Sequence, residues 1–303
     1  MPRSHDRPLE IRAAPIALLA LAAIAPGSRA QDVRLAAAEA AVERRISASG
    51  ADVAVYFRTL DGKAEYSTRP DVTFHAASTM KVPVMIELFH QVQQGKLRLE
   101  DQIAVRNEFH SIVDGSSYAL SVTDDSEGEL YKAEGQSRAV SELCELMITA
   151  SSNFATNLLI EKLGVENIRA TVSNLGAGGV VVLRGVEDGK AFAKGLNNTA
   201  TARGLATLME AIAKGKAVDA PSSRTMIAIL ERQRFNEGIP AGLPPGTSVA
   251  HKTGEITRIQ HDAAIVFAKR PYVLVVMVRG LADPKQSTAL ISDISRELYR
   301  ATQ

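Results

Sequence analysis

Ser78 and Lys81 stand three residues apart in the stretch FHAASTMKVPVMIELFHQV. The apolar residues Met80, Val84, Leu88 and Val92 recur at helical spacing, which predicts a core helix there. Positions three apart share a helix face, so the hydroxyl and the amine would point the same way. Near the positive end of a helix a lysine is easier to hold neutral, and a neutral lysine can take a proton from a serine. Because Pro83 lies inside the pattern, either the first turn is distorted or the helix begins near Val82.

Two further polar motifs follow in the chain. Ser151 and Asn153 lie just before a predicted helix in ITASSNFATNLLI, and Lys252-Thr253-Gly254 lies on a predicted strand in AHKTGEI. Taken alone, each has an ordinary structural explanation, because Ser-x-x-Lys arises by chance about once in a chain of this length and Lys-Thr-Gly in about one chain in ten. All three motifs in this order, each in a suitable local context, are hard to assign to chance and indicate a functional site.

The elements that must position these motifs follow a simple order along the chain. Strand patterns occur near both ends, in DVAVYFRTL and AEYST and then in TSVAHKTGE, DAAIVFA and YVLVVMVRG. Helical patterns cover 33–48, 138–149, 153–163, 165–174, 199–214, 221–232 and 284–301. A polar stretch at about 106–137, hereafter the excursion, shows no clear element. We therefore expect an α/β (α+β) fold, in which the terminal parts form one antiparallel five-stranded sheet flanked by helices, with a helical region inserted.

The composition is that of an ordinary globular protein, with 303 residues, 46% hydrophobic, 23% charged and a formal net charge of +1. An arginine-containing start, the apolar run AAPIALLALAAIA and small residues before a cut predict a signal peptide at 1–30. The alternative is an N-terminal anchor, although the run is short for a membrane span. Removing this segment leaves a chain near neutrality, so we expect no nucleic-acid partner and no membrane association after cleavage.

Other chemistries have little support. The only cysteine is Cys144, which excludes an internal disulfide and lies in an apolar helical stretch, where we expect it to be part of the core. The histidines show no zinc spacing and no Gly-x-Ser-x-Gly motif is present, so we expect neither a metal nor a cofactor. His251 and His261 could in principle serve a Ser-His-Asp arrangement, but both fall on strand-like stretches that no pattern connects to a serine.

With these motifs, the chain resembles the class A β-lactamases, within the wider group of penicillin-recognising serine enzymes. The resemblance covers most of the chain after residue 30, and SRAVSELCELMITASSNFATNLLIEKLG is especially close. It implies one β-lactamase/DD-peptidase-like catalytic domain at 31–303, with a sheet region at about 31–75 plus 220–303 and a helical region at about 76–219. It also implies a secreted, periplasmic monomer that acts on a small β-lactam or a cell-wall peptide.

The resemblance assigns catalytic roles to particular residues. Ser78 would attack a carbonyl and form an acyl-enzyme, and Lys81 would activate it directly or through water. Ser151 would pass a proton to the leaving nitrogen. Lys252 would keep Lys81 and Ser151 correctly charged and help to attract the substrate carboxylate.

The substrate-binding positions that the resemblance implies are Asn153, Thr253, Gly254 and Glu255. Asn153 would bond the side-chain amide of the substrate, and the hydroxyl of Thr253 would hold its carboxylate. The oxyanion hole would consist of the backbone N–H groups of Ser78 and Glu255. Either Arg258 or Arg279 could add a contact to the carboxylate.

Three departures from the family pattern have consequences. Ser152 replaces the aspartate in the middle of the second motif, a position that is usually structural. The excursion lengthens the gap between the first two motifs and could form a wall of the cleft. Glu255 places a carboxylate where the family usually has a small residue, which would disfavour some anionic substrates.

Deacylation is the open question, because the family places a glutamate in a Glu-x-x-Leu-Asn string that this chain lacks. Alignment on RGVE assigns the role to Glu187, whereas alignment on GLN places Ala193 there and leaves no base. Asp188 is a third candidate. With a working base the enzyme would turn over β-lactams, and without one it would stay acylated like a penicillin-binding DD-peptidase or act as an esterase.

Overall fold

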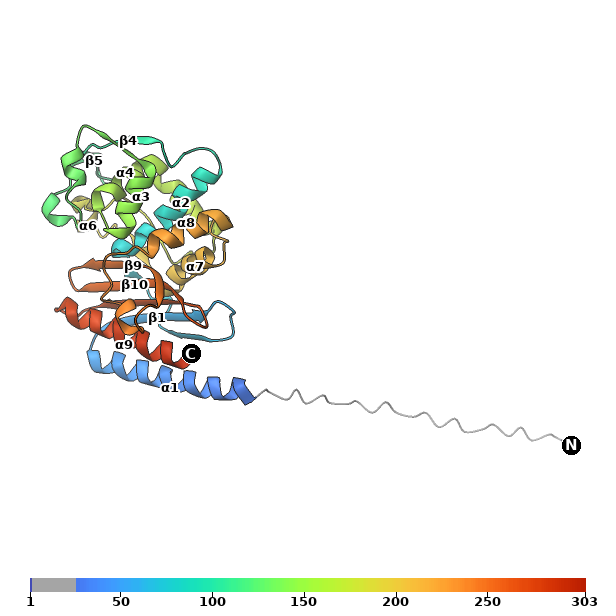
Figure 1. Ribbon diagram of the computed structural model, residues 1–303. Coiled ribbons are helices and arrows are strands. Elements are labelled where there is room, and N and C mark those ends of the chain that lie inside the picture. The colour runs from blue at the N-terminus through green and yellow to red at the C-terminus, as the bar shows by residue number, and fades with distance from the viewer. Residues whose placement is uncertain (2–25) are drawn as a thin grey trace.

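The computed structural model describes Met1 and residues 26–303. At its centre lies an antiparallel sheet of five strands in the order β2-β1-β11-β10-β9 (Figure 1). The strands are β1 Asp52–Thr59, β2 Glu65–Thr68, β9 Ser248–Ile256, β10 Ile259–Phe267 and β11 Tyr272–Arg279. Both ends of the chain thus contribute to one sheet, which confirms the predicted fold class.

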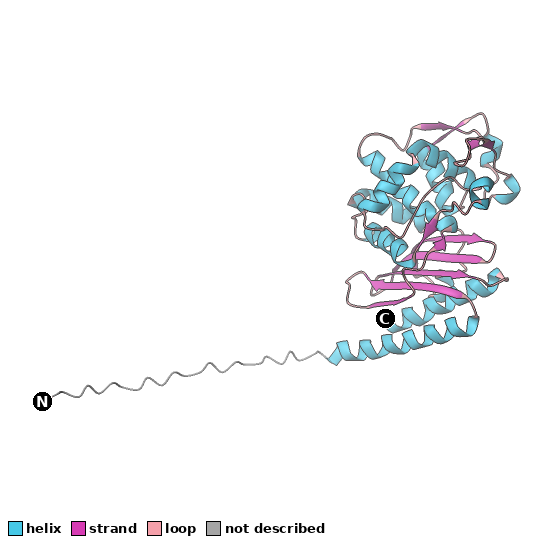
Figure 2. Cartoon of the chain, turned by 180° about the vertical axis from the view of Figure 1, so that it is seen from behind, coloured by secondary structure: helices cyan, strands magenta, loops and turns pink. Residues whose placement is uncertain are grey.

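Helices cover both faces of the sheet. The first and last helices, α1 Pro26–Ser49 and α9 Pro284–Thr302, lie side by side against one face, as Figures 1 and 2 show. Their apolar side chains and one face of the sheet form a core that includes Phe57 and Ile294, both fully buried. Burying both faces of a sheet is a common way to stabilise a layered fold of this size.

The helical region covers the other face. Its helices are α2 Lys81–Gln93, α3 Val140–Thr149, α4 Asn153–Leu163, α5 Val165–Asn174, α6 Gly189–Ala193, α7 Ala202–Ala213 and α8 Ala220–Leu230. The helix predicted at 199–214 begins three residues late, because Thr199–Ala200 forms β8, which pairs with β3, Phe74–His75. Thr201 then starts α7 by accepting a hydrogen bond on its side chain from the backbone N–H of Gly204.

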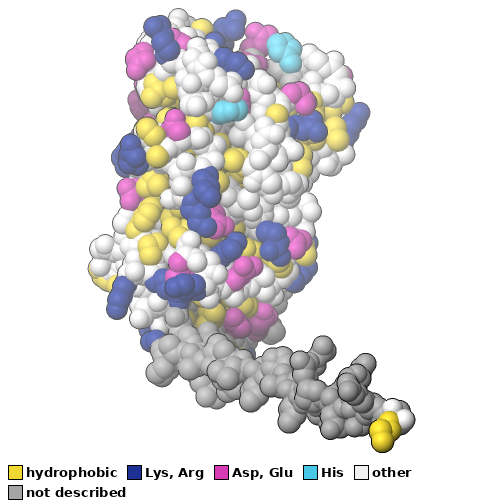
Figure 3. All heavy atoms as spheres, turned by 90° about the vertical axis from the view of Figure 1, so that its right-hand side faces the viewer, with side chains coloured by type: hydrophobic (Ala, Val, Ile, Leu, Met, Phe, Trp, Pro, Cys, Tyr) yellow, Lys and Arg dark blue, Asp and Glu magenta, His cyan; other side chains and the backbone are white. Residues whose placement is uncertain are grey.

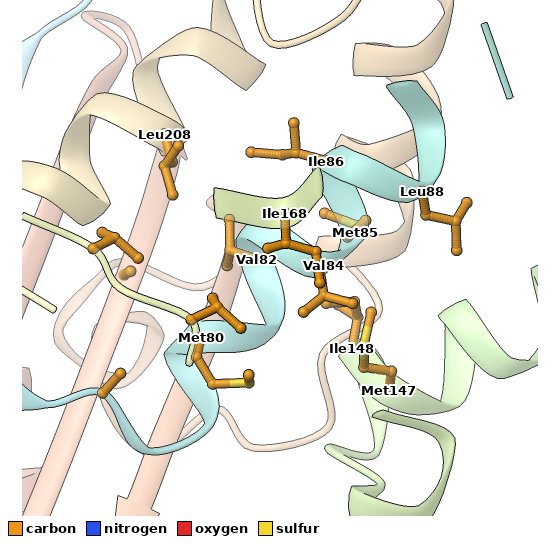
Figure 4. Packing of buried hydrophobic residues seen from close by; sticks show 14 of the residues in the cluster. Met80, Val82, Val84, Met85, Ile86, Leu88, Met147, Ile148, Ile168 and Leu208 are labelled. Carbon is orange, nitrogen blue, oxygen red and sulfur yellow. The ribbon is translucent and has the colours of Figure 1, made fainter. Parts of the chain in front are cut away.

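The segment at the start of α2 has the distorted first turn that Pro83 predicted. Ala77–Met80 forms a 3₁₀ helix, η1, and the α-helix begins at Lys81. Pro83 is then the third residue of α2, where its missing N–H costs no hydrogen bond. Every residue of α2 from Lys81 to Phe89 is buried, and Figure 4 shows its apolar side chains packed among those of neighbouring helices. A helix that is surrounded on all sides gives the reactive residues a rigid base.

The excursion contains more structure than its sequence indicated. Its ends are joined by β4 Gln102–Ala104 and β7 Ser137–Ala139, and within it lie β5 Phe109–His110, β6 Ser117–Tyr118 and two 3₁₀ turns, η2 Val122–Asp124 and η3 Leu130–Ala133. Phe109 is buried with its ring edge against Phe154 of α4. The excursion is therefore packed on the helical region, although its strands are too short to show a sequence period.

On the face shown in Figure 3, acidic and basic side chains of the described residues are interspersed over the surface. No helix among these residues is long and apolar enough to cross a membrane. Most of the predicted signal peptide, 1–30, lies outside them. Cys144 is fully buried in α3, and burial raises the pKa of its thiol to about 12. The thiol is thus part of the core, as its sequence context predicted.

Candidate active site

Ser78 and Lys81 meet at the junction of η1 and α2. The amine nitrogen Nζ of Lys81 lies 3.0 Å from the hydroxyl oxygen Oγ of Ser78. In a 3₁₀ helix positions three apart are eclipsed, so the distorted turn brings the two side chains into direct contact. The preceding residue, Ala77, has φ = 45°, a left-handed conformation that is unusual for alanine. His75 supports this turn by accepting a hydrogen bond on Nδ1 from the N–H of Ala77, at 3.0 Å.

The second motif approaches Lys81 from the start of α4. The Nζ of Lys81 lies 2.6 Å from the carbonyl oxygen of Ser151, 3.2 Å from its Oγ and 2.9 Å from Oδ1 of Asn153. Burial lowers the pKa of Lys81 to about 7, although the carboxylates of Asp125 and Glu187 oppose the shift. A lysine with this pKa is neutral in a large fraction of molecules at neutral pH, so it can accept a proton.

The third motif supplies a second buried lysine from β9. The Nζ of Lys252 lies 3.0 Å from Oγ of Ser151 and 2.9 Å from the carbonyl oxygen of Thr253. Burial lowers the pKa of Lys252 well below its ordinary value, and repulsion from the nearby charge of Lys81 lowers it further. The hydroxyl of Ser151 therefore connects the two lysines, and a proton can pass between them through it.

β9 also brings its backbone against the turn that carries Ser78. It is an edge strand, so one of its sides has no strand partner and faces η1. A methyl group at Gly254 would lie 3.0 Å from the backbone nitrogens of Ser78 and Thr79. Only a glycine allows so close an approach, and this explains the third residue of the Lys-Thr-Gly motif.

Asn153 links Lys81 to the loop that follows α5. Its Oδ1 accepts from Lys81, and its Nδ2 donates to Oε1 of Glu187 at 2.6 Å. Glu187 has φ = 62°, a second left-handed conformation at the site, and its side chain lies at the edge of the cleft. Partial burial raises the pKa of Glu187 against the effect of the Asn153 hydrogen bond, and the carboxylates of Asp124 and Asp125 add to the rise.

The two other candidates for the deacylation base lie in different surroundings. Asp188 is buried and accepts hydrogen bonds from the hydroxyl of Ser111 at 2.9 Å, the N–H of Ile112 at 3.0 Å and the N–H of Ala191 at 3.0 Å. Its carboxylate thus holds the excursion and the start of α6. Ala193 is exposed at the end of α6. Of the three positions, only Glu187 bonds to Asn153.

A cleft of about 810 Å³ opens beside Ser78 and is lined in part by Asn153, Glu187, Glu255 and Arg258. A second hollow of about 430 Å³ shares Ser78 and Asn153 with it and adds Ser151 and Thr253. Residues of all three motifs therefore line these two adjoining hollows, which together are called the groove below. Glu255 lines both hollows and its side chain is exposed there.

The two arginines considered for carboxylate binding differ in their contacts. Arg258, in the turn between β9 and β10, lines the cleft and donates to the carbonyl of Gly280. Arg279 is held by Asp52 at 2.7 Å and by the carbonyl of Thr73 at 3.1 Å, and its guanidinium lies over the ring of Phe74. Of the two, only Arg258 is among the residues that line the cleft.

The two strand histidines serve the sheet. His251 bonds through Nδ1 to Asp262 at 2.9 Å and through Nε2 to Asn236 at 3.2 Å. His261 bonds through Nε2 to the carbonyl of His75 at 2.9 Å, and burial lowers its pKa to about 4. In the part of the chain that the structure describes, neither imidazole bonds to a serine hydroxyl, and no cluster of three or more His, Cys, Asp or Glu side chains could hold a metal ion.

Sequence reasoning did not identify Asp125 of the excursion as a member of this site. Its carboxylate accepts hydrogen bonds from the backbone N–H groups of Asn153 at 3.0 Å and Phe154 at 2.8 Å. The sequence offers no signal for this contact, because Asp125 belongs to an acidic, polar stretch whose spacing from α4 follows no period.

Comparison with known proteins identifies the family of this chain. A model of the β-lactamase enzyme family matches residues 37–302. A search among curated proteins gives no match.

Solved structures give three informative matches. A β-lactamase from Sphaerobacter thermophilus DSM 20745 is 28% identical with a TM-score of 0.75, over 89% of this chain and 97% of that one. PBP-A is 30% identical with a TM-score of 0.73, over 89% and 95%. An ancestral class A β-lactamase is 25% identical with a TM-score of 0.73, over 89% and 99%. With a family model covering most of its length and these structural relatives, the chain belongs to the class A β-lactamase family.

Proposed function

We propose that this protein is an exported serine hydrolase that opens β-lactam rings through an acyl-enzyme on Ser78. The observation that carries the proposal is the contact of Ser78 with Lys81 at 3.0 Å, with the Lys81 amine buried and its pKa lowered to about 7. This arrangement supports a neutral amine that takes the proton of Ser78 as its oxygen attacks the lactam carbonyl.

Ring opening then requires a proton on the leaving nitrogen. As the lactam C–N bond breaks, Ser151 gives its proton to the nitrogen and recovers one from Lys81, which returns Lys81 to its neutral form. Lys252, 3.0 Å from the Ser151 hydroxyl, orients this hydroxyl and stabilises the negative charge that develops on its oxygen as the proton leaves. The product of this step is an ester of Ser78, and the former lactam nitrogen is now an amine of the opened ring.

The substrate would lie along the groove that borders the three motifs. The hydroxyl of Thr253 and the guanidinium of Arg258 would hold the substrate carboxylate, and Asn153 would bond its side-chain amide. Gly254 allows β9 to approach the Ser78 turn, so that the N–H groups of Ser78 and Glu255 can receive the developing oxyanion.

Hydrolysis of the ester is assigned to Glu187. Its raised pKa and its bond to Asn153 support a carboxylate that orients a water and accepts its proton as the water oxygen attacks the ester carbonyl. The bond from the carbonyl carbon to the Ser78 oxygen then breaks, and this oxygen takes up the proton that Glu187 received, directly or through water, which returns Glu187 to its ionised form. Replacing Glu187 would stop the reaction at the acyl-enzyme.

A second candidate function is that of a penicillin-binding DD-peptidase or esterase with slow or absent β-lactam turnover. PBP-A, which is 30% identical, favours it, and a variant of PBP-A has been solved as an acyl-enzyme complex with penicillin G. Both candidates share the acylation step and differ only in whether the Ser78 ester is hydrolysed.

A stopped-flow time course with a chromogenic cephalosporin tests the proposal. Colour should grow far past one equivalent of enzyme, and Glu187→Gln should reduce it to a burst of one equivalent. Ser78→Ala should abolish labelling by a fluorescent penicillin. A wild-type burst that stops at one equivalent would favour the PBP-A-like function, and unchanged labelling of Ser78→Ala would contradict both.

We also propose that residues 1–30 are removed on export and that 31–303 acts as one monomeric catalytic domain in the periplasm. The charged and apolar pattern of that segment supports this, and class A β-lactamases are typically exported proteins. The intact mass of protein from a periplasmic extract checks it, because the mature chain should begin at Gln31. A mass that includes the first 30 residues would contradict cleavage there.

A further inference from the structure

The excursion reaches the active site through one side chain, Asp125. Its oxygen Oδ1 accepts from the N–H groups of Asn153 at 3.0 Å and Glu127 at 3.2 Å. Its oxygen Oδ2 accepts from the N–H of Phe154 at 2.8 Å, the hydroxyl of Tyr131 at 3.1 Å and the hydroxyl of Ser152 at 3.4 Å. A half-buried carboxylate with so many donors is fixed in place by both the excursion and α4.

The position of this carboxylate is also favourable electrostatically. It sits at the N-terminus of α4, where unpaired N–H groups and the helix dipole stabilise negative charge. Ser152 caps the same helix through the N–H of Ala155 at 3.1 Å, so Asp125 satisfies donors that the cap leaves free. The ring of Tyr131 packs against that of Phe154, with centroids 4.8 Å apart, which adds an apolar contact between the excursion and α4.

The backbone that Asp125 holds is the one that arranges the catalytic groups. Ser151 has φ = 59°, a left-handed conformation that costs energy for serine and persists only where neighbouring contacts enforce it. In that conformation its carbonyl and hydroxyl both face Lys81, and the next residue but one, Asn153, joins Lys81 to Glu187. A shift of this turn would therefore misplace three groups together.

We propose that Asp125 is a positioning residue for the β-lactam reaction, which holds the Ser151–Asn153 turn against Lys81 and sets the charge that Lys81 faces. This inference rests on the proposed function. The charged groups that face Lys81 are Asp125, Glu187 and Lys252. Of these, Asp125 is the one that neither the sequence motifs nor the family resemblance identified.

The proposal predicts two separable effects on acylation. In the wild type the acylation rate constant should rise with pH through about 7, where Lys81 loses its proton. Asp125→Asn should lower the plateau by about 10- to 100-fold, because an amide cannot accept from both backbone N–H groups. It should also move the midpoint to lower pH, because a neutral side chain no longer favours the protonated form of Lys81.

Two matched variants separate geometry from charge. Asp125→Glu keeps the charge but is one methylene too long for both backbone bonds, so the rate should fall while the midpoint stays near that of the wild type. Glu129→Gln removes an exposed charge from the same segment, where the Glu129 carboxylate forms an ion pair with neighbouring Lys132 on the surface. It should leave both the plateau and the midpoint unchanged.

The measurement is the rate of acylation by a fluorescent penicillin across pH, with thermal unfolding of each variant to establish that it is folded. Wild-type rates for both Asp125 variants would overturn the proposal, as would a loss of rate in Asp125→Asn without a shift of the midpoint. If Asp125→Asn does not fold, Asp125→Glu decides the geometric part. If the wild type is not acylated, the proposed function fails and this inference fails with it.

Discussion

The amine of Lys81 has no exposure to solvent and has four oxygen atoms within hydrogen-bonding distance. A neutral amine donates only two hydrogens, so a hydroxyl of Ser78 or Ser151 must donate to its lone pair. This requirement turns one of the two serines toward Lys81 with its proton, as the proposed acylation step needs. The same burial that prepares the amine for chemistry makes its charged form costly.

That cost predicts a dependence of stability on pH. The pKa of Lys81 is about 7 when folded against 10.5 for a free lysine, so between these values the unfolded chain binds more protons. The free energy of unfolding should therefore rise with pH in this window, by up to about 1.4 kcal/mol per pH unit. In Lys81→Met the contribution of Lys81 to this pH dependence is absent. The pKa of Lys252 is also lowered less in this variant, because the charge of Lys81 no longer repels it.

Urea unfolding of both proteins at about pH 7, 8 and 9 checks this sign. The wild type should gain stability relative to Lys81→Met as the pH rises. A difference between the two proteins that is constant or falls with pH would show that Lys81 is not held in a depressed-pKa environment.

At the scale of elements, the excursion also contacts the loop that carries Glu187. Ser111 and Ile112 donate to Asp188, and the phenol of Tyr118 donates to the carbonyl of Val186 at 3.2 Å. Both residues adjacent to Glu187 are thus tied to the excursion. The left-handed conformation of Glu187 between them is stabilised from outside its own loop.

Asp188→Asn should therefore affect hydrolysis more than acylation. An amide would lose one of the acceptor positions that hold the excursion and α6, and Glu187 would be placed less accurately against Asn153. The deacylation rate should fall by about 10- to 100-fold, with a smaller change in acylation. Burst and steady-state phases of the cephalosporin time course separate the two rates.

Asp114→Asn is the matched control for this variant. Asp114 is exposed and contacts α6, directly after that loop, through Lys190 at 2.8 Å. Because exposed ion pairs contribute little, both phases should stay near those of the wild type. Equal losses in the two variants would show that any contact with the excursion matters, and not the buried carboxylate of Asp188.

The sequence predicted elements and contacts unequally well, for a physical reason. The bounds of α4 and α5 match the predicted helices because apolar residues repeat there at helical spacing. The contact of Ser78 with Lys81 follows from local geometry. By contrast, Asp125 reaches Asn153 across 28 positions, and only the packing of the excursion brings them together. The choice among Glu187, Asp188 and Ala193 likewise depends on side-chain directions that no local pattern encodes.

At the scale of the whole molecule, the layer formed by α1 and α9 packs on one face of the sheet, and the helical region packs on the other. Ile294 of α9 is fully buried between this layer and the sheet. Across the two helices, Arg45 of α1 bonds to Asp293 and Glu297, each at 2.7 Å. The layer therefore supports the sheet that holds Lys252.

Ile294→Ala should destabilise the protein by about 2–5 kcal/mol, because it removes buried methyl groups and leaves a cavity. Arg300→Ala, on the exposed side of the same helix, should change stability by less than about 0.5 kcal/mol. Urea unfolding of the two variants measures the difference. Similar values for both would contradict the packing of α9 against the sheet.

The order of the strands has a consequence for synthesis. β11 is the last strand in the chain and the middle strand of the sheet, and Asp52 of β1 bonds to Arg279 across 227 positions. A nascent chain therefore leaves the ribosome with β1 and β2 as an isolated hairpin, which is only marginally stable. Until translation has passed Arg279, the pair β1–β2 and the pair β9–β10 lack β11, the strand that joins them. A chain that stops before Tyr272 would thus lose its central strand and not merely its end.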